Sequence, residues 1–214
     1  MICRRLWSGA AWWASVAGLV GVVGPAQAQA DARAASSPPL LQWVLQTQDN
    51  EGAPFIIIDK RQARLWLFKA DGAAAGSTPI LLGSARGDVS VAGIGEREIE
   101  DIREHERTTP AGRFIAEAAR NAGGEDIFWI DYDAAVSMHR VRANNVAEKR
   151  LQRLATPTPA DNRISYGCIN VPVLFYDKRI QPLFAAQRGV VYVLPETVPQ
   201  QALFTPAKRR PGRL

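Results

Sequence analysis

The sequence predicts a mostly β fold, a single sandwich or barrel with a few short helices. Short apolar runs rich in β-branched and aromatic residues outnumber the segments with helical spacing, and turn signals recur between them. The chain has 214 residues, enough for one domain with a substantial core. Its net charge of +5 comes from charges of both signs scattered along the chain, so no nucleic-acid partner is expected.

The first part of the chain has the features of a signal peptide over residues 1–30. Arg4 and Arg5 precede an apolar stretch, and small residues after Pro25 fit the A-x-A cleavage pattern. An uncleaved anchor is the alternative, because the stretch is about long enough to span a bilayer. We favour cleavage because of the Pro25 break. The rest of the chain is then expected in the periplasm, with no stable membrane span.

Three further parts follow the signal peptide. Residues 31–53 are expected to form a linker and a short helix, the helix over the apolar positions of 40–48. Residues 54–196 are expected to form the β domain, and residues 197–214 a basic C-terminal tail.

The β domain is expected to contain seven short strands. The second strand is apolar on both faces, since Leu65 and Leu67 alternate with Trp66 and Phe68, so both faces should be buried. Asp71-Gly72 then marks a turn. The strands are expected over 55–58, 63–68, 79–85, 112–116, 127–130, 135–139 and 189–194.

The remaining segments are expected to be helical or irregular. Residues 146–154 and 173–184 have helical spacing. Residues 86–109 form a long polar loop rich in glycine and charge, and a loop of this length in a compact domain is usually functional or mobile.

Cys168 would be the one cysteine left after Cys3 is removed with the signal peptide. A lone thiol outside the cytoplasm cannot form an internal disulfide. Such a thiol is either buried and inert, as free cysteine often is, or retained because a reaction needs it. The neighbouring residues bear on this choice.

Thiol catalysis needs a base and donors for the developing oxyanion. His139 ends an apolar strand and can therefore point rigidly into a cleft, whereas His105 lies among charged residues in the polar loop and is expected to be solvated. Gly167 allows a tight turn in which amides near Cys168 could face an oxyanion. Asn170 could hold this turn by side chain to backbone hydrogen bonds.

The segment Ser165-Tyr166-Gly167-Cys168-Ile169-Asn170 resembles the Ser/Thr-His-Gly-Cys-hydrophobic-Asn/Arg signature of L,D-transpeptidase catalytic domains. Met138-His139 resembles the family's hydrophobic-His pair before the signature. Residues 108–114 resemble its Thr-Pro-x-Gly-x-Phe segment, and residues 57–72 its first hairpin. The matches fall in the family's order and span about residues 54–195.

The resemblance implies a mixed-sheet β-sandwich or barrel-like domain in which Cys168 is the nucleophile and His139 the base. Gly167, Tyr166, Ser165 and Asn170 would support the site and its oxyanion. It implies no metal and no cofactor. The donor would be a peptidoglycan stem peptide, cut after its third residue. The acceptor would be a stem-peptide amine, a protein lysine such as that of a lipoprotein, or water.

The chain departs from the family's pattern in three places. Tyr166 stands where the signature has histidine, and Arg140 stands where glycine or serine is usual. The interval between His139 and Cys168 is longer than usual, so residues 140–163 could form a lid. Arg140, Arg142 and Arg163 are candidates for binding acidic groups of a stem peptide, and a solvated surface is the alternative for each.

Two other functions remain open from the sequence. The same thiol could hydrolyse the bond, as an L,D-carboxypeptidase or amidase, because the shape of the cleft selects the acceptor. A catalytically inactive cell-wall-binding relative is the non-enzymatic alternative, in which Tyr166 and Arg140 mark lost catalysis. A metal site is not expected, because the few His and Cys residues lack ligand spacing.

Overall fold

The computed structural model describes Pro38 and residues 40–205. The predicted signal peptide, the linker residues 31–37 and 39, and the tail residues 206–214 lie outside the described residues. Within the described part of the chain, no helix is both long and apolar enough to cross a bilayer.

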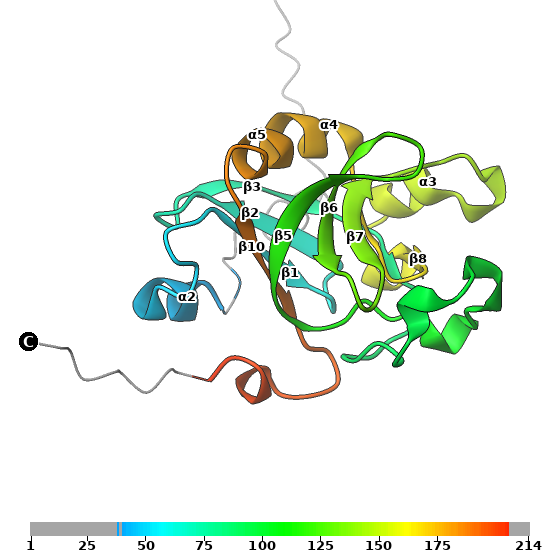
Figure 1. Cartoon of the computed structure of the whole chain (residues 1–214), viewed down its shortest axis with the longest axis horizontal. Helices are drawn as coiled ribbons and strands as arrows, with labels where there is room; N and C mark the ends of the chain where they lie inside the picture. Colours follow the sequence, from blue (N-terminus) through cyan, green and yellow to red (C-terminus); the bar gives the residue numbers. More distant parts are fainter. Residues whose placement is uncertain (1–37, 39, 206–214) are drawn as a thin grey trace, which may run out of the picture.

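A mixed eight-stranded sheet forms most of the fold (Figure 1), which confirms the predicted mostly β class. A small two-stranded sheet pairs β4 (Leu82–Gly83) with β8 (Arg163–Ser165) in parallel. The strands of the large sheet, in spatial order, are β3 (Ala74–Pro79), β2 (Arg64–Phe68), β1 (Phe55–Asp59), β10 (Gly189–Leu194), β5 (Gly112–Arg120), β6 (Asp126–Asp131), β7 (Val136–Arg140) and β9 (Ile169–Val171).

The large sheet is nearly closed into a barrel. Its two edge strands are β3 and β9. The chain that leaves β3 reaches β9 at Leu81, which exchanges two backbone hydrogen bonds of 2.9 Å with Asn170. The sheet therefore bends until its first and last strands lie almost side by side.

Both faces of the first part of the sheet are buried, as the pattern of β2 predicts. Leu65 and Leu67 belong to the larger core cluster, and Trp66 and Phe68 belong to a second cluster on the opposite face. The larger cluster is covered by a helical segment made of α4 (Val173–Phe175), the π-helical turn η6 (Tyr176–Ile180) and α5 (Gln181–Phe184). The second is covered by α2 (Leu41–Thr47).

The remaining helical segments lie outside the cores (Figure 1). The loop 86–109 contains three short turns, η1 (Ile94–Glu96), η2 (Ile99–Asp101) and η3 (Glu104–Glu106). Residues 141–163 contain η4 (Val146–Glu148), α3 (Arg150–Ala155) and η5 (Pro159–Asn162). The predicted helix over 146–154 is therefore interrupted, because Lys149 adopts a left-handed conformation with φ 51°.

Two predicted boundaries need correction. The strand predicted over 79–85 is only the short β4 (Leu82–Gly83), and the third strand of the chain precedes it at Ala74–Pro79, because pairing with β2 holds an Ala-, Gly- and Ser-rich segment of low β propensity as a strand. The folded domain also continues past residue 196. Phe204, beside the turn η7 (Gln200–Ala202), is buried in the second core cluster against Trp43 and Tyr192.

Candidate active site

The parallel pairing of β7 and β9 brings the predicted nucleophile and base together. His139 is the register partner of Asn170, and Met138 is that of Ile169. Met138 and Ile169 point into the larger core cluster. Because side chains alternate along a strand, Ser137, His139 and the residue that precedes β9, Cys168, share the opposite face.

Three groups of β7 and its preceding turn surround the Cys168 thiol. The N–H of Ser137 donates to Sγ at 3.5 Å, and the Ser137 hydroxyl lies 3.6 Å from Sγ. On the other side, the thiol lies 3.7 Å from the carbonyl oxygen of Ala135. Ala135 has a left-handed backbone with φ 50°, an uncommon conformation for a residue with a side chain. The turn therefore holds this carbonyl against the thiol at a cost in backbone strain.

The surroundings of Cys168 favour its thiolate. Burial alone raises the pKa of the thiol, but hydrogen bonding and the charge of His139, with the two hydrogen bonds from Ser137, outweigh it and bring the pKa below its ordinary value of 9.0. The thiolate is the nucleophilic form of cysteine. The site thus has the electrostatics that a reactive thiol needs.

His139 is held in one orientation. Its Nδ1 lies 2.7 Å from the carbonyl oxygen of Arg140, a group that can only accept a hydrogen bond. Nδ1 therefore donates its proton to this carbonyl, which leaves Nε2 as the ring nitrogen that can exchange a proton with the thiol. The orienting group of this base is a backbone carbonyl, which any residue at position 140 would supply.

The turn that carries Cys168 is closed by its own side chains. The hydroxyl of Ser165 donates to the carbonyl oxygen of Cys168 at 2.7 Å and accepts from the N–H of Gly167 at 3.2 Å. The Asn170 side-chain amide donates to the same Cys168 carbonyl at 3.2 Å, the type of hydrogen bond expected from the sequence. These contacts fix the backbone on both sides of the thiol.

Because Ser165 takes the N–H of Gly167, that amide is occupied, and it is a poor candidate for the predicted role as an oxyanion donor. The N–H of Cys168 itself donates to no acceptor within residues 38 and 40–205. It can therefore donate to an oxyanion that forms on a carbonyl attacked by Sγ.

Thr109 anchors the same turn from the neighbouring segment. Its hydroxyl donates to the carbonyl oxygen of Gly167 at 2.7 Å and accepts from the N–H of Gly83 at 2.9 Å. Gly167 has φ +130°, a conformation that disfavours side chains, and a Cβ built there would lie only 3.0 Å from the carbonyl oxygen of Thr108. The segment 108–109 therefore packs directly on the backbone that presents the thiol.

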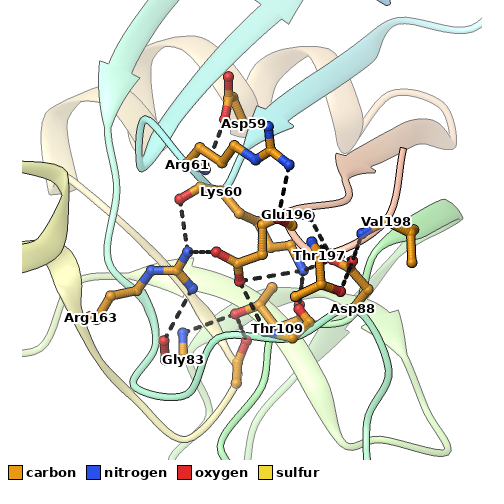
Figure 2. Close-up of polar contacts among 12 residues, drawn as sticks. Asp59, Lys60, Arg61, Gly83, Asp88, Thr109, Arg163, Glu196, Thr197 and Val198 are labelled. Carbon is orange, nitrogen blue, oxygen red and sulfur yellow. Dashed lines mark hydrogen bonds and ion pairs between the residues drawn. The ribbon is translucent and has the colours of Figure 1, made fainter. Parts of the chain in front are cut away.

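A buried ionic network lies behind Thr109 (Figure 2). The Lys60 ammonium is fully buried and donates to the Asp88 carboxylate and to the carbonyl oxygen of Thr109, each at 2.9 Å, and to the carbonyl oxygen of Gly87. All three of its donors are thus used. Asp88 also accepts hydrogen bonds from the chain just after β10, from the N–H groups of Glu196, Thr197 and Val198.

Glu196 extends this network to β8. Its carboxylate pairs with Arg163 at 2.6 Å, and Arg163 also donates to the carbonyl oxygen of Lys60 at 2.8 Å (Figure 2). Burial lowers the pKa of Lys60. Burial raises the pKa of Asp88, but hydrogen bonds from Thr197, Lys60 and the backbone outweigh it and hold that pKa well below its usual range. The network joins β1, the loop 86–109, β8 and the C-terminal segment.

The three arginines predicted to bind substrate are all engaged elsewhere. Arg163 belongs to the buried network. Arg140 points away from the His139 face of β7, where it pairs with Asp126 at 3.0 Å and Asp177 at 2.6 Å and lies over the ring of Tyr176. Arg142 pairs with Glu125. Each guanidinium already has a carboxylate, so none is placed as a free receptor for a second one.

The long interval between His139 and Cys168 contacts the turn that carries Cys168. Arg150 in α3 donates to the Asn170 side-chain oxygen at 2.7 Å and pairs with Glu148 at 2.5 Å. Arg153 donates to backbone carbonyls of Glu148 and Asp161, each at 2.8 Å. The Arg150–Asn170 hydrogen bond holds α3 beside β9, and the Arg153 bonds tie this long interval together.

A cavity of about 320 Å³ opens beside the turn that precedes β7. Its size is at the lower end of the range for small-molecule sites. Ala134, next to the residue that contacts the thiol, is part of its wall, and Asp131 and Asp133 supply acidic groups. The other lining residues are Asp88, Val89, Ser90, Val91, Ala92, Gly93, Pro110, Ala111 and Phe114.

Several residues of this site are not apparent from the sequence. Ser137 could have been found from the alternation that places it on the face of His139. Lys60 could not, because it lies in a polar turn and its partners at 88, 109 and 196 are distant in the chain. His105 is exposed in η3, as the sequence predicted.

The sequence matches no protein-family model, and no curated protein is significantly similar to it. Solved structures with a similar fold include the catalytic domain of the Enterococcus faecium L,D-transpeptidase, at 21% identity and a TM-score of 0.39, over 67% of this chain and 98% of that chain. The helical cell shape determining protein Pgp2 of Campylobacter jejuni is 15% identical, with a TM-score of 0.44, over 73% of this chain and 55% of that chain. An L,D-transpeptidase fragment (residues 123–326) of Xylanimonas cellulosilytica is 15% identical, with a TM-score of 0.44, over 81% of this chain and 71% of that chain. Identities and TM-scores this low do not carry an activity over to this chain.

Proposed function

We propose that this chain is a cysteine-dependent L,D-transpeptidase that acts on peptidoglycan stem peptides in cell-wall cross-linking or remodelling. The observation that carries the proposal is the set of groups around Cys168: an oriented His139, two hydrogen bonds from Ser137, and a thiol pKa below its ordinary value. The proposed substrate class, peptidoglycan stem peptides, is inferred from the resemblance of residues 165–170 to the L,D-transpeptidase signature.

The reaction proceeds in two steps, acylation of Cys168 and transfer of the acyl group to the acceptor. His139 Nε2 takes the thiol proton, and Cys168 Sγ attacks the carbonyl carbon of the third stem residue. The C–S bond forms, the C–N bond breaks, and His139 returns the proton to the leaving amine. An acceptor amine then attacks the thioester, gives its proton to His139 and releases the thiolate. With water as acceptor, the same steps produce hydrolysis.

Acylation by a carbapenem tests the nucleophile. The purified chain is incubated with the β-lactam and weighed by mass spectrometry. We expect one adduct on the wild type, none on Cys168→Ala, and slow formation on His139→Ala. Arg61→Ala, a change at an exposed arginine that contacts the backbone of Glu196, is the control and should be acylated normally. Absence of an adduct on the wild type, together with no turnover of stem peptides, would leave the inactive wall-binding relative as the better description.

The choice between transpeptidation and hydrolysis depends on the acceptor. The cavity beside Ala134 carries Asp131 and Asp133, which suits an amine, and this favours transpeptidation over hydrolysis. Incubation of a stem tetrapeptide with an acceptor peptide that carries a free amine, followed by mass spectrometry, distinguishes the two. A cross-linked dimer supports the transpeptidase, and a tripeptide alone supports the L,D-carboxypeptidase.

We also propose that the chain is exported to the periplasm. Residues 1–30 support this, because a basic start, an apolar stretch and small residues around a cleavage point are together typical of a signal peptide. Expression of the full chain in a Gram-negative host, fractionation and N-terminal sequencing test it. Recovery of the uncleaved chain in the cytoplasm would contradict export.

A further inference from the structure

Arg107 places a half-buried guanidinium over the ring of Tyr166, two residues before the nucleophile. Its Cζ lies 3.8 Å from the ring centroid. Its Nε and Nη2 both donate to the carbonyl oxygen of Ile102, at 3.2 and 3.1 Å. The guanidinium is therefore held in place from two sides, while its Nη1 donates to no acceptor within the described residues.

The charge of Arg107 is not neutralised by a carboxylate in the described part of the chain. Glu106, the acid next to it in the sequence, is bound by Arg97 through two hydrogen bonds of 3.0 Å. Arg140 and Arg163, by contrast, each have their own carboxylates. A fixed, partly desolvated guanidinium with an unused nitrogen is the arrangement that binds an external carboxylate well.

Arg107 also begins the segment that packs against the turn carrying Cys168. The segment 107–109 runs beside the turn of the nucleophile, since Thr109 bonds the Gly167 carbonyl and the Thr108 carbonyl approaches Gly167 closely. The guanidinium itself is tied to this turn through the ring of Tyr166, two residues before Cys168. Tyr166 supplies the face on which the guanidinium stacks.

We propose that Arg107, positioned by Tyr166, binds the C-terminal carboxylate of the leaving residue of the donor stem peptide. This inference rests on the proposed function and assigns to one side chain of this chain the contact with the donor's terminal carboxylate, one residue beyond the scissile bond. It also gives the tyrosine at position 166 a role in recognition that does not require it to act as a base.

Binding in a Cys168→Ala background tests this without chemistry. Calorimetry compares a stem tetrapeptide with a free C-terminal carboxylate against the same peptide ending in a carboxamide. Because a hydrogen bond to a charged group is worth more than a neutral one, we expect the acid to bind roughly tenfold more tightly. Adding Arg107→Ala or Arg107→Gln should weaken binding of the acid peptide about tenfold and leave binding of the amide peptide unchanged.

Two further variants separate recognition from folding. Tyr166→Phe keeps the ring and should keep the preference for the acid, whereas Tyr166→Leu removes the stacking face and should reduce it. Arg120→Ala is the matched control, because Arg120 is exposed and bonds only the carbonyl of Gly124 at the far end of β5. It should change neither affinity.

The inference is overturned if the parent binds acid and amide equally, if both affinities fall together in Arg107→Ala, or if neither peptide binds. Failure of the proposed function has a different signature, the absence of a carbapenem adduct on wild-type Cys168. Carboxylate selectivity at Arg107 in a chain that forms no adduct would support the binding site and reject the enzyme.

Discussion

The hydroxyl of Thr109 donates a hydrogen bond of 2.7 Å to the carbonyl oxygen of Gly167, the residue that precedes Cys168. The carbonyl of Thr109 in turn accepts from the buried Lys60 ammonium. One residue thus connects the nucleophile's turn to the charges beneath it. The geometry of the thiol depends on contacts that reach across the domain.

Replacing Thr109 by valine should destabilise the fold and slow acylation. The change leaves the Gly167 carbonyl and the Gly83 N–H without their buried partner, which costs about 1–3 kcal/mol of unfolding free energy. Urea unfolding and the rate of carbapenem acylation measure the two effects, and we expect acylation to slow roughly tenfold or more. Thr78→Val removes a buried hydroxyl on β3 and is the control, since it should leave acylation unchanged.

Gly167→Ala should abolish acylation. Its φ of +130° is strained for any side chain, and the new Cβ would lie 3.0 Å from the carbonyl oxygen of Thr108, so the turn must shift. Gly124→Ala is the matched control, because Gly124 also has a positive φ, +81°, but an added Cβ meets nothing within 4 Å. Both variants should lose stability, and only the first should lose the adduct. Equal acylation of both would show that the turn is not rigidly positioned.

Alkylation of Cys168 by iodoacetamide should have its pH midpoint below 9.0, because His139 and Ser137 lower the thiol pKa. A lowered pKa means that the thiolate already forms at lower pH, so the rate should rise earlier on the pH scale than for an ordinary cysteine. In His139→Ala, burial still raises the thiol pKa but His139 no longer lowers it, so the pH midpoint should move upward. Identical midpoints in the two proteins would contradict the role of His139.

Asp88→Asn should weaken the fold at neutral pH and flatten its acid denaturation. The folded-state pKa of Asp88 lies below its ordinary value of 3.8, so its carboxylate contributes stability above that pH and loses it as the pH falls. Because Lys60 would lose a buried partner, we expect a loss of roughly 3–5 kcal/mol at pH 7, measured by urea unfolding across pH. Glu106→Gln is the control. Its carboxyl, with its pKa lowered to about 2 by Arg97, pairs with a partly exposed guanidinium rather than a fully buried ammonium, so the change should affect stability far less.

Local patterns predicted most strands of the large sheet, though not β3 or β9, and singled out Cys168 and His139 as candidate reacting side chains. Alternation placed His139 at the end of a buried strand, and the turn chemistry around Gly167 singled out Cys168 before any contact was known. Such features are encoded over a few residues. The position of β3 could not be found in this way, because its small residues form a strand only through pairing with β2.

The long-range ion pairs also could not be predicted from the sequence. Lys60 follows a strand and precedes Arg61, a pattern typical of an exposed turn, yet its ammonium is fully buried. Its partners lie in three distant segments, and only the tertiary fold decides that they meet. The same reason explains why Arg140 and Arg163, which were predicted to meet substrate, instead satisfy carboxylates of the chain itself.

The last strand, β10, is the central strand of the sheet. It pairs in parallel with β1 and antiparallel with β5, and so joins the N-terminal hairpin to the strands that lead to His139. Cys168 and His139 thus both precede, in the sequence, the strand that unites the two halves of the sheet. Pairing so distant in sequence is slow to form. The arrangement of Cys168 and His139 therefore depends on long-range pairing that only residues 189–194 complete.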